Sequence, residues 1–357
     1  MFKVKIYPLS RRIAKSLYRD NLSESVYQLL VKYLDLELDC VKVIKTTSDF
    51  NVKRYEDNSC SAIVNVKKIN DLKGIRQFFK TVNDKLEING YYIFTAETHS
   101  QRRKRLKKKI SKFFFPIYYT FDFIYKRVFP KWSPTRALYF KLTNGRNRTL
   151  SETEILGRIV SCGFKILEIK EIEGQTHYVT KKTNNVDTIP YSSNGFIFKM
   201  KRTGKNGHPI WVSKFRTMHP YAEYLQEYIH KKNNLRDGGK FKNDFRVTSW
   251  GRFMRKFWID ELPMIYNLLK GDLKLIGVRP LSKQYLSLYS EELISMRRNT
   301  KPGLAPPFYA DNPTTFVEIM NSEKKYIMDY EKNPFTTDVK YFFRICNNII
   351  FKSTTSC

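Results

Sequence analysis

The sequence predicts an α/β protein of two domains, residues 1–185 and residues 190–357. A chain of 357 residues is long enough for two domains. Residues 61–96 read as strand, helix and strand in succession, which is typical of a parallel α/β layer. From about residue 194 the pattern changes to a hairpin followed by several helices, which predicts a helix-rich α+β domain.

The first elements of the N-terminal domain follow from the spacing of apolar residues. Ser23–Leu36 has the helical period, and Ser61–Val66 reads as a buried strand. Apolar residues from Ile69 to Leu86 then mark one face of a helix, which Asn89-Gly90 is expected to end. Tyr91–Ala96 reads as a second buried strand.

The same domain continues after an insert with one more helix and two strands. The predicted helix lies near Glu152–Ser161 and stops at Cys162-Gly163. Strands are expected at Phe164–Ile169 and Thr176–Thr180, with a turn at Glu173-Gly174 between them. This order supports the parallel α/β layer.

The chain is strongly basic, with 65 Lys+Arg against 34 Asp+Glu and a formal net charge of +31. Such an excess predicts an anionic partner, which is nucleic acid, a lipid headgroup or a phosphorylated substrate. The five cysteines show no CxxC pair, so we expect reduced thiols in a cytosolic setting and no zinc site. No apolar run approaches the roughly 20 residues of a spanning helix, and no signal peptide is expected.

Residues at about 100–135 form an insert in which a basic run precedes a dense group of aromatic residues. A basic cluster attracts anionic lipid headgroups, and aromatic side chains favour the headgroup level. We therefore predict an interfacial segment at a membrane surface. Aromatic residues packed beneath a loop and an arm that binds nucleic acid are the two alternatives. The predicted membrane contacts are Phe113, Phe114, Phe115, Tyr118, Tyr119 and Trp132.

The N-terminal half resembles the C-terminal part of a class I methyltransferase: strand, helix, strand, helix, strand and then an antiparallel strand. The resemblance implies a truncated Rossmann-like domain. The first glycine of the chain is Gly74, so no glycine-rich loop follows an early strand, and the cofactor half is missing. The expected role is docking or support. An unrelated small α/β domain fits the same pattern.

The C-terminal domain is expected to begin with a β-hairpin. Gly195–Lys199 and Pro209–Lys214 read as strands on either side of a turn that contains Asn206-Gly207. Helices are expected at His219–Lys231, over most of Ser249–Leu269, and in two later segments, 324–330 and 338–350.

Two adjacent carboxylates, Asp260 and Glu261, lie between Arg255 and Arg279 in the sequence. A nearby positive charge favours the ionised form of a carboxylate, which can act as a nucleophile or hold a divalent metal. Arginines bind phosphate oxygens in bidentate fashion. The set predicts phosphoryl chemistry. The alternative is an ordinary helix in which the two carboxylates pair with Lys256 or Arg252.

A series of ordered blocks carries a second and more specific resemblance. The blocks are 195–198, 202–207, 214–218, 244–248, 251–255, 260–263, 267–272, 277–280 and 302–303. Together they resemble the soluble core of bacterial sugar transferases, the monotopic polyprenyl-phosphate phosphoglycosyl transferases, over roughly the last 160 residues.

This resemblance implies a sugar-phosphate transfer from a nucleotide-diphosphate sugar, typically UDP-linked, to a polyprenyl phosphate. It implies that Asp260 is the nucleophile and forms an aspartyl-phosphosugar intermediate, that Glu261 assists, and that both carboxylates hold Mg²⁺. Arg255, Arg279, Lys214 and Arg216 are the expected phosphate ligands. The implied place is the cytoplasmic face of a bacterial inner membrane, in exopolysaccharide or capsule synthesis.

The sequence differs from the family's usual pattern at three places, and these differences leave open an alternative to an active enzyme. The family's apolar membrane segment before Gly195 is replaced by a polar stretch, and Val278 stands where a proline is usual. Residues 304–309 replace the usual Gly and Gln positions. The alternative is a catalytically silent, membrane-bound homologue that scaffolds glycan enzymes. A nucleic-acid partner is not expected, because the chain has no recognition motif.

Overall fold

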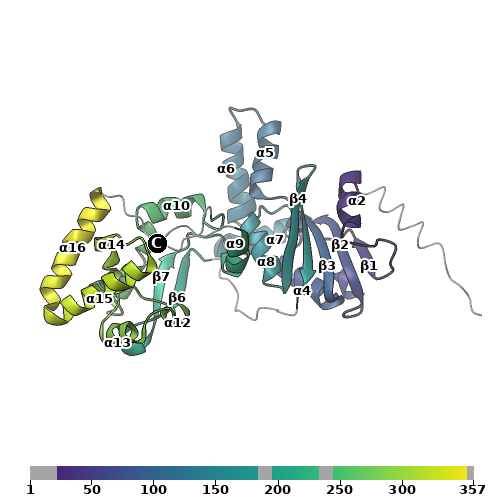
Figure 1. Ribbon diagram of the computed structural model, residues 1–357. Coiled ribbons are helices and arrows are strands. Elements are labelled where there is room, and N and C mark those ends of the chain that lie inside the picture. The colour runs from purple at the N-terminus through teal and green to yellow at the C-terminus, as the bar shows by residue number, and fades with distance from the viewer. Residues whose placement is uncertain (1–21, 184–194, 233–243, 352–357) are drawn as a thin grey trace, which may run out of the picture. The chain divides into compact units, whose positions relative to one another are not determined.

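The computed structural model describes residues 22–183, 195–232 and 244–351 (Figure 1). The chain divides into two compact units, which are described separately. The N-terminal unit comprises residues 1–192 with 220–225, and the C-terminal unit comprises 193–219 with 226–357. Residues 184–187, part of the polar stretch that replaces the family's membrane segment, lie outside the described residues.

A five-stranded mixed sheet forms the centre of the N-terminal unit. Its strand order is β1 (Val41–Ile44), β2 (Cys60–Lys68), β3 (Leu86–Ala96), β5 (Gln175–Lys182) and β4 (Phe164–Ile172). The first three strands are parallel, whereas β5 runs antiparallel to both of its neighbours. The predicted parallel layer and the final antiparallel strand are therefore confirmed.

Helices cover both faces of this sheet. On one face, α2 (Glu24–Val31) packs its buried residues against Val64, Ile93 and Val179. On the other face, α4 (Ile75–Lys85) places Phe79 against Tyr92 and Phe94. α8 (Glu152–Val160) packs beside α4 and β4. The short helix α3 (Phe50–Lys53) also contacts α4. The result is a three-layer α/β/α unit.

The prediction at Ile69–Gly90 was wrong at both ends of the helix. Ile69–Asp71 is a separate 3-10 helix, η1, and α4 ends at Lys85. Leu86 already pairs with Cys60, so Asn89-Gly90 lies inside β3 rather than after the helix. Asn89 has a φ of 69°, and the pairing shifts register before Tyr91. The turn-favouring dipeptide marks an irregularity within a strand.

The aromatic insert forms a helical hairpin in which α5 (His99–Lys109) and α6 (Phe115–Phe123) lie side by side (Figure 1). A π-helical turn, Ile124–Val128, and α7 (Ser133–Thr143) follow. Arg102 joins the two arms of the hairpin, because its Nε and Nη2 each lie 2.7 Å from a carboxylate oxygen of Asp122.

A buried carboxylate, Glu154 of α8, fastens the base of the insert to the rest of the unit. It pairs with Lys131, Arg127 and Arg158. These cations hold the pKa of Glu154 well below its usual range even though burial acts in the opposite direction. Arg158 also lies 4.4 Å from the ring centroid of Tyr221. One carboxylate therefore organises the insert, α8 and the segment around Tyr221.

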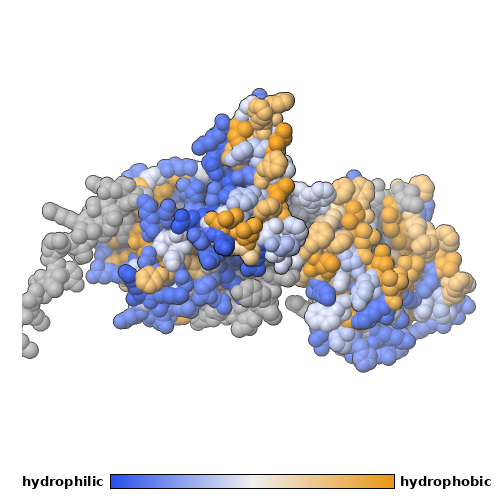
Figure 2. All heavy atoms as spheres, turned by 180° about the vertical axis from the view of Figure 1, so that it is seen from behind, coloured by the Kyte–Doolittle hydropathy of each residue, from blue (hydrophilic) through white to orange (hydrophobic). Residues whose placement is uncertain are grey.

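The tip of the hairpin exposes part of the predicted membrane-contact set. Phe113 and Phe114 are 79% and 61% exposed, and Tyr118 and Trp132 are also exposed. Figure 2 shows hydrophobic atoms along this hairpin. The predicted membrane contact of Phe115 is wrong, because this side chain is buried. It stacks on half-buried Tyr119 with ring centroids 5.5 Å apart and so supports the hairpin from inside.

The C-terminal unit begins with the predicted hairpin, β6 (Ile197–Thr203) and β7 (Pro209–Phe215), which pair antiparallel. α10 (Ser249–Lys256), the 3-10 helix η5 (Ile259–Glu261) and α11 (Met264–Leu269) follow. A two-stranded parallel ribbon, β8 (Lys274–Ile276) with β9 (Gly303–Ala305), joins them to the remaining helices. These are α12 (Lys283–Leu286), α13 (Glu291–Asn299), α14 (Phe308–Asp311), α15 (Phe316–Lys332) and α16 (Pro334–Phe351).

The main hydrophobic core of the C-terminal unit contains residues from β8 to α16, including Ile276, Leu293, Phe308, Tyr326 and Tyr341. The two late helices predicted from the sequence are confirmed as parts of α15 and α16. None of the helices in the described ranges is long and apolar enough to cross a bilayer.

The predicted helix His219–Lys231 was wrong at its start. His219 lies outside any helix, and its backbone N–H donates a hydrogen bond to the carbonyl of Arg246. The 3-10 helix η4 (Ala222–Leu225) then precedes α9 (Gln226–Lys232). Residues 220–225 pack in the N-terminal unit, where a Cβ on Gly157 would lie 2.2 Å from the carbonyl oxygen of Tyr221. Only glycine allows this approach of α8 to the segment.

Candidate functional site

Trp258 breaks the helical region that contains the carboxylate pair. Its φ of 59° and ψ of 12° place it in the left-handed region, which is uncommon for a bulky side chain. α10 therefore ends, and η5 begins in a new direction that turns Asp260 and Glu261 inward. Their exposed fractions are 3% and 8%. Backbone strain of this kind is concentrated at functional sites.

Lys214 of β7 donates a hydrogen bond to Oε1 of Glu261. The two side chains are 17% and 9% exposed, so this is a largely buried ion pair. Asn267 of α11 holds the same strand in place: it accepts from the backbone N–H of Ser213 at 3.2 Å and donates to the carbonyl of Trp211 at 2.7 Å. The ion pair joins two residues that are 47 positions apart in the sequence. They belong to two of the sequence blocks described above, 214–218 and 260–263.

Thr217 positions the next predicted residue. Its Oγ1 accepts from Nε of Arg255 at 3.1 Å and from Nη2 at 2.9 Å. Its carbonyl accepts from the backbone N–H and the hydroxyl of Thr248, the N-cap of α10. A Cβ on Gly251 would lie 2.0 Å from that carbonyl oxygen, so glycine is required for α10 to approach. Arg255 is thereby fixed beside the strand that carries Lys214.

The contacts described for Arg216 and Arg279 are with residues other than Asp260 and Glu261. Arg216 donates from Nε to the carbonyl of Gly195 at 2.9 Å, and its guanidinium lies 5.0 Å from the ring centroid of Phe198. Burial lowers the pKa of Arg202, and the charge of Arg279 lowers it further. Arg202 pairs with Ile210 at the turn end of the hairpin, whereas Lys214 pairs with Phe198 at the opposite end. A phosphate-binding role for Arg216 and Arg279 stays a prediction.

An apolar cavity of about 240 Å³ opens beside Glu261. Its walls come from η5 to α11, from the β8–β9 ribbon and from α16. A wider groove of about 670 Å³ between β8 and the start of α16 shares Leu275, Ile276 and Phe342 with this cavity. The other residues that line the cavity are Trp258, Leu262, Ile265, Leu304, Ala305, Ile345, Cys346 and Ile349.

The two carboxylates of the site suit Mg²⁺ that is bound together with substrate phosphates. Within the described residues, no group of three or more His, Cys, Asp or Glu side chains has the arrangement of a metal cage. Mg²⁺ is usually held by one or two carboxylates, waters and substrate phosphates, so a two-carboxylate set fits that mode. Because Glu261 accepts a hydrogen bond from Lys214, Asp260 and the second oxygen of Glu261 are the expected ligands.

Residues 187–352 match the family model for bacterial sugar transferases. The C-terminal unit is similar to bacterial sugar transferases. The matched region contains the Asp260–Glu261 pair, Lys214, Arg255 and the residues that line the apolar cavity. The resemblance expected from the sequence blocks is confirmed.

Two curated relatives match parts of this chain. One is "Uncharacterized sugar transferase EpsL" of Bacillus subtilis (strain 168), which is 44% identical over 108 residues, or 30% of this chain and 47% of that protein. The other is "UDP-glucose:undecaprenyl-phosphate glucose-1-phosphate transferase" of Xanthomonas campestris pv. campestris, which is 30% identical over 151 residues, or 40% of this chain and 29% of that protein. The chain spans less than half the length of either relative.

Solved structures similar to this chain include a putative S-adenosylmethionine dependent methyltransferase from Listeria monocytogenes. It has 12% identity and a TM-score of 0.25, and the match covers 37% of this chain and 67% of that one. At this level of likeness, the α/β description of the N-terminal unit rests on its own strand order.

The sequence reasoning missed Thr217, Asn267 and Trp258 as positioning residues. Thr217 and Gly251 lie in separate sequence blocks, and only their contact reveals why glycine is needed at 251. A ring contact also joins Trp258 to Tyr309, with centroids 4.4 Å apart. The altered segment 304–309 therefore packs directly against the residue that precedes the 3-10 turn of the carboxylates.

Proposed function

We propose that this protein transfers a sugar phosphate from a nucleotide-diphosphate sugar, typically a UDP-sugar, to a polyprenyl phosphate. The carrying observation is that the buried Asp260–Glu261 pair lies at the edge of an apolar cavity, where Glu261 accepts a hydrogen bond from Lys214. Such a site offers a nucleophile and a cation for phosphates together with a surface for a lipid chain. The name of the Xanthomonas relative contains a substrate pair of this kind.

In the first step, a carboxylate oxygen of Asp260 attacks the β-phosphorus of the donor. A new bond forms between this oxygen and phosphorus, and the bond from phosphorus to the bridging oxygen breaks. The nucleoside monophosphate leaves with the bridging oxygen and its electron pair. The product on the protein is an aspartyl-phosphosugar. Covalent catalysis of this type divides one difficult displacement into two easier ones.

In the second step, a phosphate oxygen of the polyprenyl phosphate attacks the same phosphorus. The bond to Asp260 breaks, which restores the carboxylate and releases a polyprenyl diphosphate sugar. The cavity walls, including Leu262, Ile265 and Ile349, supply apolar contact for the first isoprene units of the acceptor. The acceptor phosphate would then lie at the cavity's charged end, beside Glu261.

Cations lower the barrier to an anionic nucleophile at a phosphorus surrounded by negative oxygens. Lys214 and Arg255 are the positioned cations, and Arg279 and Arg216 are further phosphate ligands in this proposal. A magnesium ion, when bound by Asp260 and Glu261, would neutralise charge on the donor diphosphate. Lys214 keeps the Glu261 carboxylate oriented before substrate arrives.

Membrane association follows from the same proposal, because a polyprenyl acceptor is embedded in a bilayer. The exposed aromatic tip, Phe113 and Phe114, lies on a hairpin whose helix α5 carries exposed Arg103, Lys104 and Lys107. Arg102 and Arg105 of the same run pair with Asp122 and Glu97 instead. We place the protein at the cytoplasmic face of a bacterial inner membrane, in exopolysaccharide or capsule synthesis.

The test is release of uridine monophosphate. Membranes that contain the protein are incubated with Mg²⁺, undecaprenyl phosphate and each member of a panel of UDP-sugars. At least one donor should give release that depends on the acceptor and disappears in Asp260→Asn. Full activity in Asp260→Asn would overturn the role of Asp260. Absence of release with every donor would favour the silent scaffold, in which the altered segment 304–309 has replaced substrate contacts.

A further inference from the structure

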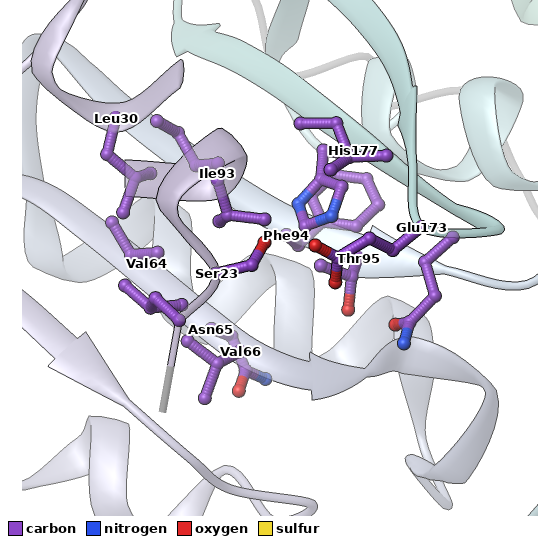
Figure 3. A pocket seen from close by; sticks show the side chains of 14 residues that line it. Ser23, Leu30, Val64, Asn65, Val66, Ile93, Phe94, Thr95, Glu173 and His177 are labelled. Carbon is purple, nitrogen blue, oxygen red and sulfur yellow. The ribbon is translucent and has the colours of Figure 1, made fainter. Parts of the chain in front are cut away.

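A second cavity lies in the N-terminal unit, on the sheet face that α2 covers. It has a volume of about 120 Å³ and is formed by β2, β3, the β4–β5 turn and the start of α2. The residues around it in Figure 3 include Ser23, Val64, Thr95 and His177. In open α/β sheets, ligands bind at the carboxyl ends of the parallel strands, and this cavity lies at that end of β3.

The strand register explains why polar groups meet there. Thr95 of β3 pairs directly with His177 of the antiparallel strand β5. Directly opposed residues point to the same face of a sheet, so both side chains point toward α2. Ile93 pairs with Val179 on the same face and belongs to the apolar cluster under α2. The cavity therefore has an apolar floor and a polar end.

Two hydroxyl groups at this end have no hydrogen-bond partner among the residues that the structure describes. Oγ1 of Thr95 is buried and unsatisfied in a residue that is 6% exposed, and Oγ of Ser23 is also unsatisfied. Ser23 is the N-cap of α2, a position where serine usually accepts a hydrogen bond from the helix, yet its side chain makes none. Buried polar groups in native proteins nearly always have partners, so each exception needs an explanation. A bound ligand supplies one.

The charge of the described lining disfavours an anionic ligand. Among the lining residues that the structure describes, Glu173 is the charged one and none is Lys or Arg, although the chain carries a net charge of +31. Burial lowers the pKa of His177, while Glu173 acts in the opposite direction. A neutral imidazole offers one donor and one acceptor. The polar end is thus built for an uncharged group with hydrogen-bonding edges.

Glu173 is held at the cavity by a two-residue turn. Its φ is 51°, and Gly174 follows with a φ of 75°. Two successive residues with positive φ are the hairpin turn that joins β4 to β5. Asparagine is favoured at such a position, so glutamate is an unusual choice. A carboxylate kept in this turn repels anions from the cavity.

We propose that this cavity binds a small uncharged heterocycle, about the size of a pyrimidine ring, with hydrogen-bonding groups on its edge. Val26, Leu30 and Ile93 would contact the faces of the ring, and Ser23, Thr95 and His177 would bind its polar edge. A cavity of about 150 Å³ accommodates a benzene molecule, so the volume suits one ring. This would be a ligand site additional to the one around Asp260.

The test uses uracil and orotate, which share one ring and differ by a carboxylate. Binding to the full-length Asp260→Asn protein is measured by saturation-transfer NMR and calorimetry, so that turnover does not contribute. Uracil should bind saturably, and orotate at least 10-fold more weakly. The Glu173→Asn variant keeps a residue suited to the turn and removes the carboxylate. It should therefore bring the affinity for orotate closer to the affinity for uracil. Equal affinities for uracil and orotate in the protein that retains Glu173 would contradict the repulsion of anions by this carboxylate.

Thr95→Val is the decisive variant, because it replaces a hydroxyl by a methyl group of similar size. It should weaken uracil binding at least 10-fold and should leave the melting temperature of the unliganded protein unchanged or higher. Uracil binding that persists in Thr95→Val is binding elsewhere, such as at the Asp260 site, and overturns the proposal. A lowered melting temperature would show that the hydroxyl has a partner in the protein and would also overturn it.

Discussion

Lys214, on the second strand of the C-terminal hairpin, donates a hydrogen bond to Glu261, the residue after the proposed nucleophile. The pair is largely buried, and it connects a strand to the 3-10 turn that a left-handed Trp258 creates. An ion pair in this position orients a carboxylate before any substrate binds. It also makes the local structure depend on both partners, because neither charge is well solvated alone.

Lys214→Met should therefore reduce both stability and transfer. Removal of one partner from a buried pair costs roughly 3–5 kcal/mol when the other charge remains. In the double variant with Glu261→Gln, the added loss should be much smaller than the sum of the two single losses. Chemical denaturation of the four proteins measures this coupling. Additive losses would show that the two side chains act independently.

Gly251→Ala should displace α10 from Thr217. The new methyl group would lie 2.0 Å from the carbonyl oxygen of Thr217, a distance that forces the backbone to move. We expect a loss of at least about 2 kcal/mol in the free energy of unfolding, the order typical of overpacking, together with reduced release of uridine monophosphate. Gly195→Ala is the matched control, because its nearest atom outside the neighbouring residues lies at an ordinary 3.5 Å.

The aromatic tip of the α5–α6 hairpin should govern membrane binding. Replacement of exposed Phe113 and Phe114 by serine should lower binding to vesicles with anionic lipid by about 10-fold or more, and leave the melting temperature nearly unchanged. Phe115→Ser should do the reverse, since that ring is buried against Tyr119. Sedimentation with vesicles and thermal melting separate the two effects. Unchanged sedimentation of the double variant would refute the predicted contact.

Stability should fall as the pH falls below about 6.5. Burial, followed by the charges of Arg127, Arg103 and Lys131, lowers the pKa of His99 to about 4. The unfolded chain then binds a proton that the folded chain does not, so stability decreases between pH 6.5 and pH 4, by up to about 1.4 kcal/mol per pH unit. The lowered pKa of Glu154 adds a loss below about pH 4.5.

His99→Gln should remove the first part of this dependence and leave the second. The measurement is the denaturant midpoint at pH 7, 6, 5 and 4 for both proteins. A difference between wild type and variant that is constant over this range would contradict the assignment to His99.

Much of the N-terminal fold could be predicted because its strands and helices have strong local periods. The segment around Ile155 and the strand that begins at Phe164 are examples. The error at Asn89-Gly90 has a physical cause: a local turn preference was read as a helix stop, whereas pairing of Leu86 with Cys60 ended the helix earlier. Tertiary pairing overrode a local signal.

In the candidate site too, the sequence identified the residues, whereas their contacts depend on tertiary packing. The ordered blocks identified Asp260, Glu261, Lys214 and Arg255, because residue types and spacing are visible in one dimension. The contact of Lys214 with Glu261 and the fixing of Arg255 by Thr217 depend on how β7, α10 and η5 pack. Burial of Phe115 was likewise invisible, since its neighbours in the sequence are equally aromatic.

The central claim is covalent transfer through Asp260, and intact-mass spectrometry tests it most directly. The protein is incubated with Mg²⁺ and a UDP-sugar that supports release of uridine monophosphate, without the lipid acceptor. The account predicts a mass increase equal to one sugar phosphate, mapped by digestion to Asp260, that disappears on addition of undecaprenyl phosphate and is absent from Asp260→Asn. Acceptor-dependent turnover with no adduct on Asp260 under any quench condition would contradict it.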